Sequence, residues 1–122
     1  MADISITSSF NLTKGTLKRS YSRNDTVDFV ATAPTVASGC ASIGTTQEAL
    51  VLQDVSSLGW ARFENLDTTN YVEIGVVVSA TFYPFIKLLA GEFVFTRLGT
   101  AVVPYARANT AAVQLDYEIF QA

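Results

Sequence analysis

The sequence predicts an all-β protein, an antiparallel β-sandwich or jelly-roll-like fold of roughly eight to ten short strands. Apolar and polar residues alternate over most of the chain, which is the periodicity of half-buried strands. Runs rich in β-branched and aromatic residues are separated by turn formers at intervals of about 8–12 residues, a spacing typical of sandwiches. No segment is a convincing helix, so a parallel α/β fold is not expected.

The first part of the chain shows this alternation clearly. Apolar side chains alternate over residues 4–12, and a turn is expected at residues 14–15. A second strand over residues 17–21 is expected to end at the turn formers of residues 23–25, and another alternating run follows over residues 27–31. The basic residues of this region predict only a solvated strand pair, since so short a charge block carries little information.

The middle of the chain is less regular. Residues 36–46 are small and polar, which fits either a flat strand or a loop. Residues 47–53 are the only plausible helical turn, and we favour a strand because so short a helix is marginal. A loop over residues 54–59 is expected to precede a strand over residues 60–65.

The second half carries the strongest strand pattern, after a turn at residues 66–70. Ala90–Gly91 lies between two apolar runs and predicts a two-residue hairpin. Pro104 predicts that its strand lies at an edge or a bulge. The strands expected here are residues 71–79, 82–89, 92–97, 102–107 and a last one from residue 113.

The inward faces of these strands predict the core, because apolar sets with a period of two mark the buried side of a sheet. The predicted core residues are Val72, Ile74, Val76, Val78, Phe93, Phe95, Val113, Leu115, Tyr117 and Ile119.

Length and composition predict one domain, residues 1–122, that assembles with other chains. The chain has 122 residues, of which 49% are hydrophobic and 16% charged, against a usual charged share of about 25%. So apolar a chain is expected to bury more than its own core, as a homo-oligomer or in a lattice. Residues 3–12 and 35–46 are the candidate contact surfaces, because they carry few of the charges and prolines that protect exposed strand edges.

Several function classes are excluded or disfavoured by residue content. The chain has no histidine and one cysteine, which excludes a Ser–His triad, a Cys–His dyad, a Cys/His zinc site and an internal disulfide within it. The net charge of −3 disfavours nucleic acid as a partner. No apolar run is long enough to span a membrane as a helix, and no export signal is visible, so synthesis in a host cytoplasm is expected.

The residues that carry chemistry each have a simpler structural explanation. Cys40 has no cationic neighbour in sequence and is expected to be a small buried or semi-buried residue. Asp116 and Glu118 lie two apart on one strand face, which is more typical of a solvent-facing side than of a hydrolase carboxylate pair. Residues 65–70 offer oxygens to a calcium ion, but Asx-type turn bonding explains the same residues.

No catalytic, cofactor-binding or metal site is therefore predicted, and the chain is expected to be no enzyme and to have no cofactor and no small-molecule substrate. Aromatic residues are the remaining candidates for binding. They would serve a sugar platform or a protein interface equally well. Those expected near the surface are Trp60, Tyr71, Tyr83 and Tyr105.

Residues 58–75, 82–92 and 97–98 resemble a segment seen in small virion proteins of tailed bacteriophages. The resemblance covers about residues 57–120 and consists of turns and strand starts, with no catalytic motif. It implies a β-sandwich structural protein located in the virion, with the major capsid protein or other virion proteins as partners. Within that class we favour a capsid decoration (cement) protein, since a small sandwich without insertions suits capping a lattice.

Two alternatives stay open at this point. The first is a neck or tail accessory protein, because the resemblance does not distinguish head from tail. The second is a carbohydrate- or receptor-binding β-sandwich module, which would need exposed aromatic residues gathered on one face or at one loop end. A histidine-free glycosidase or lyase is a remote third reading, since its acids have no visible partner arrangement.

Overall fold

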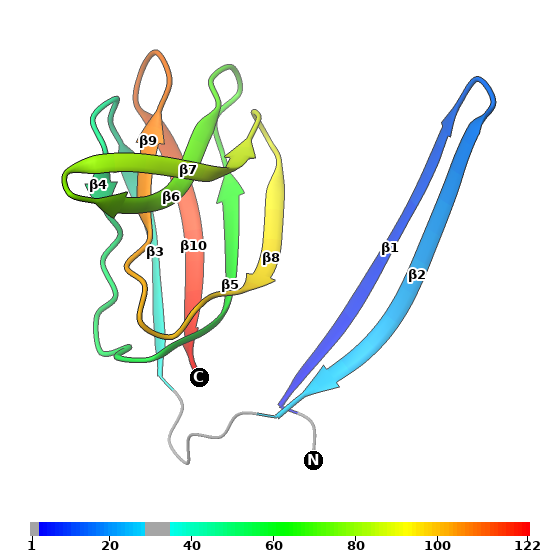
Figure 1. Ribbon diagram of the computed structural model, residues 1–122, viewed down its shortest axis with the longest axis horizontal. Coiled ribbons are helices and arrows are strands. Elements are labelled where there is room, and N and C mark those ends of the chain that lie inside the picture. Colours follow the sequence, from blue (N-terminus) through cyan, green and yellow to red (C-terminus); the bar gives the residue numbers. More distant parts are fainter. Residues whose placement is uncertain (1–2, 29–34) are drawn as a thin grey trace. The chain divides into compact units, whose positions relative to one another are not determined.

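The computed structural model describes residues 3–28 and 35–122. All of its regular structure is β, in antiparallel sheets, as the sequence predicts. We predicted a single domain, but the contacts divide the chain into two compact units, Met1–Thr32 and Ala33–Ala122. The first is a hairpin and the second holds the sandwich (Figure 1). No helix in the described part of the chain is long and apolar enough to cross a membrane.

The hairpin consists of β1 (Ile4–Lys14) and β2 (Leu17–Val27), paired antiparallel along their whole length. Gly15 makes the turn with a φ of 58°, a left-handed conformation that glycine adopts without strain. The predicted turn at residues 23–25 is wrong, because these residues continue the ladder opposite residues 6–8 of β1. The run predicted over residues 27–31 lies largely outside the described residues.

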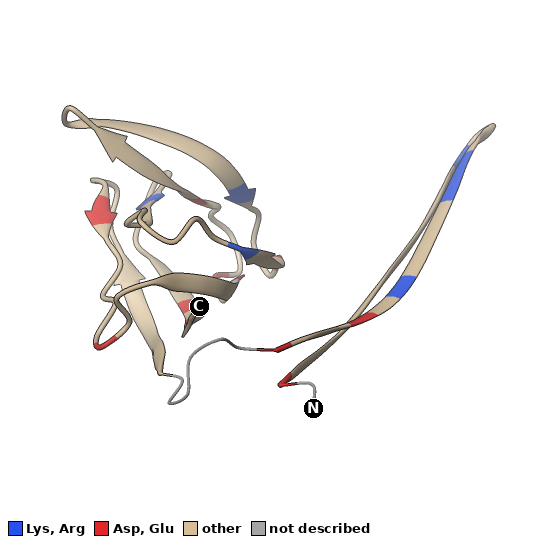
Figure 2. Cartoon of the chain, turned by 60° about the horizontal axis from the view of Figure 1, so that its bottom comes forward, with Lys and Arg blue, Asp and Glu red and all other residues tan. Residues whose placement is uncertain are grey.

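Charge is distributed unevenly along the hairpin. Its basic segments lie toward the turn and its acidic segments toward the open end (Figure 2). The basic residues are Lys14, Lys18, Arg19 and Arg23, and the acidic residues are Asp3, Asp25 and Asp28. Within β2, Arg23 Nη2 pairs with Asp25 Oδ2 at 2.9 Å.

The second unit is a jelly roll of two four-stranded sheets. One sheet has the order β3-β10-β5-β8 and the other β4-β9-β6-β7. Every connection except that from β6 to β7 leads from one sheet to the other, as in the two Greek keys of a jelly roll. Figure 1 shows β6 and β7 crossing over the strands of the first sheet. The strands are β3 (Val36–Ile43), β4 (Glu48–Ala49), β5 (Leu58–Asn65), β6 (Val72–Val78), β7 (Thr81–Leu88), β8 (Phe93–Arg97), β9 (Tyr105–Ala108) and β10 (Val113–Gln121).

The core lies between the two sheets, and alternate residues of β5, β6 and β10 contribute to it. Six of the ten predicted core residues are buried, and their period-2 pattern is confirmed. They are Val72, Ile74, Val113, Leu115, Tyr117 and Ile119. Val76 and Phe95 are half-buried.

The predicted core was wrong at Val78 and Phe93, whose side chains are 57% and 71% exposed. Val78 is the last residue of β6 and pairs with Thr81, the first residue of β7, so it lies beside the turn that joins these strands and beyond the buried part of β6. In β8 the opposite face is inward, and Val94 packs against the core in place of Phe93. In β8, apolar alternation therefore identified the strand but not its buried side.

Two further expectations about elements were wrong, and a third is confirmed in part. Ala90–Gly91 does not close a hairpin, because β7 and β8 belong to different sheets and the chain turns a corner there. β9 is not an edge strand, and Pro104 lies just before it, where its carbonyl accepts a hydrogen bond from Leu50 N at 3.0 Å. Residues 47–53 contain a strand rather than a helix, as expected, but the strand is only the two-residue β4.

Candidate functional site

The outward face of the sheet β3-β10-β5-β8 carries a cluster of charged side chains around Arg62. Its Nη2 lies 2.8 Å from Asp116 Oδ2 and 2.8 Å from Glu118 Oε1, and its Nη1 lies 3.2 Å from Glu64 Oε1. The antiparallel register places Arg62 opposite Glu118 and Glu64 opposite Asp116, which brings these residues of β5 and β10 together. Hydrogen bonds to Asp116 and then Glu118 raise the pKa of Arg62 above its ordinary value.

This cluster shows what the paired carboxylates do in the fold. The sequence correctly placed Asp116 and Glu118 on one face, but they are bound to a shared guanidinium as well as facing solvent. One cation among three carboxylates leaves the patch net negative.

Aromatic side chains flank the cluster on β5 and β8. The rings of Trp60 and Phe95 stack with centroids 5.0 Å apart, and the Arg97 guanidinium lies 5.7 Å from the Trp60 ring. Phe93 extends this apolar edge into solvent. Aromatic residues and arginine are enriched at protein–protein interfaces.

The predicted aromatic residues do not form one platform. Trp60 lies on the first sheet, whereas Tyr83 and Tyr105 lie on strands of the other. Tyr83 is exposed, and Tyr71 is half-buried with Lys87 Nζ 4.1 Å from its ring centroid. A sugar platform built from these four residues is therefore not assembled by the fold.

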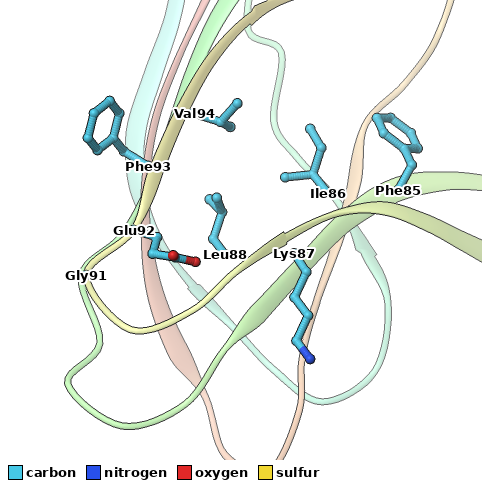
Figure 3. Close-up of a pocket in the computed structure, with 8 residues that line it drawn as sticks. All are labelled: Phe85, Ile86, Lys87, Leu88, Gly91, Glu92, Phe93 and Val94. Atoms are coloured by element: carbon cyan, nitrogen blue, oxygen red, sulfur yellow. The ribbon is translucent and has the colours of Figure 1, made fainter. Parts of the chain in front are cut away.

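A groove of about 560 Å³ opens at the corner where β7 leads into β8. Ile86 and Leu88 of β7 and Val94 of β8 lie toward its interior, whereas Phe93 lies away from it (Figure 3). β7 and β8 are the edge strands of their sheets on this side, so the sandwich is open here. Sequence reasoning missed the groove because it expected these strands to pair with each other.

The loop at residues 65–70 is organised by Asn65, which is fully buried. Its Nδ2 donates to Asn70 O at 2.9 Å and to Leu88 O at 3.1 Å, and its Oδ1 accepts from Asp67 N at 2.9 Å. The Asp67 carboxylate accepts from Thr69 N at 2.9 Å and Asn70 N at 2.6 Å. The Asx-type interpretation of this loop is confirmed, because Asn65 Oδ1 and Asp67 Oδ2 accept hydrogen bonds from backbone amides of the turn.

Replacing Asn65 with alanine is expected to lower the free energy of unfolding by about 3 kcal/mol, because buried partners lose their hydrogen bonds. Asn109→Ala is the matched control, since Asn109 is exposed and its Oδ1 accepts a hydrogen bond from Tyr71 N at 2.9 Å. The control should cost about 1 kcal/mol or less, because water can replace the lost acceptor. Urea denaturation measures both, and equal losses would contradict a special role for Asn65.

We expect Asp67 to make the free energy of unfolding depend on pH in the acid range. Hydrogen bonds from the backbone amides of Asn70 and then Thr69 hold the pKa of Asp67 below its ordinary value of 3.8. Because the folded-state pKa is depressed, this carboxylate stabilises the fold above the unfolded-state pKa, and the contribution is lost as pH falls through the folded-state pKa. Asp67→Asn keeps an acceptor but cannot titrate.

At neutral pH the wild type should have a larger free energy of unfolding than Asp67→Asn. As the pH is lowered from 7 to 2, the two free energies should converge. A difference between the two proteins that does not change with pH would contradict this account.

The side chain of Cys40 is exposed, whereas we expected it to be buried or semi-buried. It lies on the edge strand β3, opposite Asp116, and its Sγ is 3.4 Å from Gln114 Oε1. The predicted contact stretch 35–46 contains this edge strand, with Val36 also exposed. The other predicted stretch, residues 3–12, lies in β1 and pairs with β2 of its own chain.

Comparison with known proteins adds no relative, since no family model, no curated protein and no solved structure matches this chain.

Proposed function

We propose that this chain is a non-enzymatic structural protein of a tailed-phage particle, most specifically a capsid decoration protein that stabilises the shell through contacts in many copies. The observation that carries the proposal is the jelly roll joined to a hairpin that exposes Phe10, Leu12, Leu17 and Tyr21. The resemblance of residues 57–120 to small phage virion proteins supports it. Jelly rolls are also used by viral capsid domains, an analogy at the level of fold.

The chemistry of the candidate residues favours a structural role over catalysis. Asp116 and Glu118 are bound by Arg62, and Asp67 by backbone amides. Each engaged carboxylate contributes to holding strands or a turn in place. We accordingly propose that no single Asp, Glu or Cys substitution abolishes a turnover, and hydrolysis of a polysaccharide that disappears in Asp116→Asn would refute this.

A carbohydrate-binding role is the competing function, and the groove beside β8 is the observation that favours it. Its lining is mostly apolar, with Lys87 and Glu92 as the charged groups. Glu92 Oε1 already accepts a hydrogen bond from Leu89 N at 2.7 Å. Sugar recognition needs several convergent polar groups, so this groove fits an apolar protein segment better.

The test is saturation binding to emptied capsids of the phage that encodes the chain, stripped of the protein and followed by sedimentation. We expect binding in a copy number that matches the capsid lattice. Binding of only a few copies per particle would favour the neck or tail alternative. No binding to particles, together with selective glycan binding that is lost in Lys87→Ala, would replace the proposal with the carbohydrate-binding function.

A further inference from the structure

The two faces of the hairpin differ in character. One face presents Ser5, Thr7, Ser9 and Asn11 with their partners from β2, all polar. Because residues paired across the strands share a face, the other face is defined by six cross-strand pairs. We call it the apolar face: Ile4–Val27, Ile6–Asp25, Ser8–Arg23, Phe10–Tyr21, Leu12–Arg19 and Lys14–Leu17.

The apolar face has no cover within the hairpin. Phe10 is 54% exposed and Tyr21 48% exposed, although their rings stack with centroids 6.0 Å apart. Leu12 and Leu17 are similarly exposed. A two-stranded hairpin is at best marginally stable in water, so this face needs a partner layer.

We propose that the apolar face is covered by the same face of a second copy's hairpin, stacked antiparallel to form a two-fold symmetric, four-stranded sandwich. The charge distribution argues for this occupant. Each hairpin is basic toward its turn and acidic toward its open end (Figure 2). Antiparallel stacking places each basic end on the other copy's acidic end, which favours association.

The register of the pairs makes the complementarity specific. A two-fold axis crossing the hairpin midway between the Ser8–Arg23 and Phe10–Tyr21 pairs lays β1 over β1 and β2 over β2. Ile6 then faces the second copy's Leu12, and Val27 faces its Leu17. These contacts place aliphatic side chains against each other along the stack.

The same operation matches the polar members of the face. Asp25 faces the second copy's Arg19, while its own Arg23 remains 2.9 Å away along β2. Arg23 faces the second copy's Tyr21, a cation over an aromatic ring. The two-fold axis repeats every contact, so the dimer contains two Asp25–Arg19 pairs.

Parallel stacking lacks this match. It brings the basic ends of the hairpins together, with Lys14 and Arg19 of one copy near those of the other, and leaves Asp25 against Ile6. A parallel trimer of hairpins concentrates the same cations further. Like charges placed together are destabilising, so the charge pattern selects the antiparallel pair.

The experiment measures the mass of the full chain by sedimentation equilibrium, without capsids, so its outcome is independent of the proposed function. We expect the wild type to be a dimer. Arg19→Asp, which sets Asp against Asp25 twice, and Asp25→Arg, which sets Arg against Arg19 twice, should each raise the dimer dissociation constant by about tenfold or more. Lys18→Asp is the matched control, since it makes the same charge change on the polar face and should leave the constant unchanged.

Mixing the two variants provides the sharpest test. In a heterodimer of Arg19→Asp with Asp25→Arg, one native and one reversed ion pair form, so the mixture should dimerise where neither variant does alone. Unfolding curves of the sandwich confirm that each variant is folded. A monomeric or trimeric wild type, equal weakening by Lys18→Asp, or a mixture that stays monomeric would overturn the proposal.

Discussion

Phe63→Ala is expected to lower the free energy of unfolding by about 3–5 kcal/mol, the range typical of truncating a buried aromatic ring. Phe63 is the largest fully buried side chain of the sandwich and lies on the inward face of β5. Its strand neighbours are Tyr117 of β10 and Val94 of β8, so the cavity would open in the middle of the first sheet's inner surface. Urea denaturation with constant m-value measures the loss.

Phe95→Ala is the matched control for this substitution. Phe95 is half-buried and stacks on Trp60 on the outward face, so its loss removes a ring pair and some burial without opening a core cavity. About 1 kcal/mol is expected. If Phe95→Ala were as costly as Phe63→Ala, the assignment of inward and outward faces in β5 and β8 would be wrong.

Gly75→Ala is expected to destabilise the sandwich by about 3 kcal/mol or more, through steric overlap with backbone. Gly75 lies at the register shift between β6 and β7. A Cβ there would overlap the carbonyl oxygen of Tyr83 and lie 2.7 Å from Pro84 Cα. Neither atom belongs to a flexible side chain, so the strands themselves would have to move apart.

Gly39→Ala separates this overlap from the general effect of removing a glycine. A Cβ at Gly39 would meet only the Tyr117 ring, with its nearest atom 3.9 Å away, which is an ordinary contact. The change in unfolding free energy should stay within about 1 kcal/mol. Comparable destabilisation by both alanines would mean that the close approach at Gly75 is not the cause.

The fold class and the last strand were predictable because their signals are local. The alternation of Val113, Leu115, Tyr117 and Ile119 needs no tertiary information to place them on one face, and all four are buried. On β5, the sequence alternation also predicted that Trp60 and Arg62 lie on the face opposite to that of Phe63. Strand existence and alternation follow from side chains that are neighbours in sequence.

The errors arose where long-range contacts decide the conformation. Ala90–Gly91 has the composition of a hairpin, but the backbone of Asn65 bonds the backbone of Gly91 and Glu92 and directs the chain into the other sheet. The turn formers at residues 23–25 stay extended because β1 pairs with them. No property of either segment alone carries this information.

Only part of the charged cluster around Arg62 was predicted, because its assembly also depends on contacts between residues distant in sequence. The sequence places Asp116 with Glu118, and Arg62 with Glu64, on the outward sides of two strands. Their convergence depends on the register between β5 and β10, which pairs Arg62 with Glu118. The groove beside β8 was missed because it exists only if β7 and β8 do not pair.

We propose that the chain is a structural component of a phage shell, and its position on the particle tests this proposal most directly. Virions of the encoding phage, imaged by electron cryomicroscopy with and without the gene for this chain, give a difference map. The account predicts density of the sandwich repeated over the capsid lattice and missing from the deletion particles. Difference density confined to the neck or tail, or no difference at any part of the virion, would contradict it.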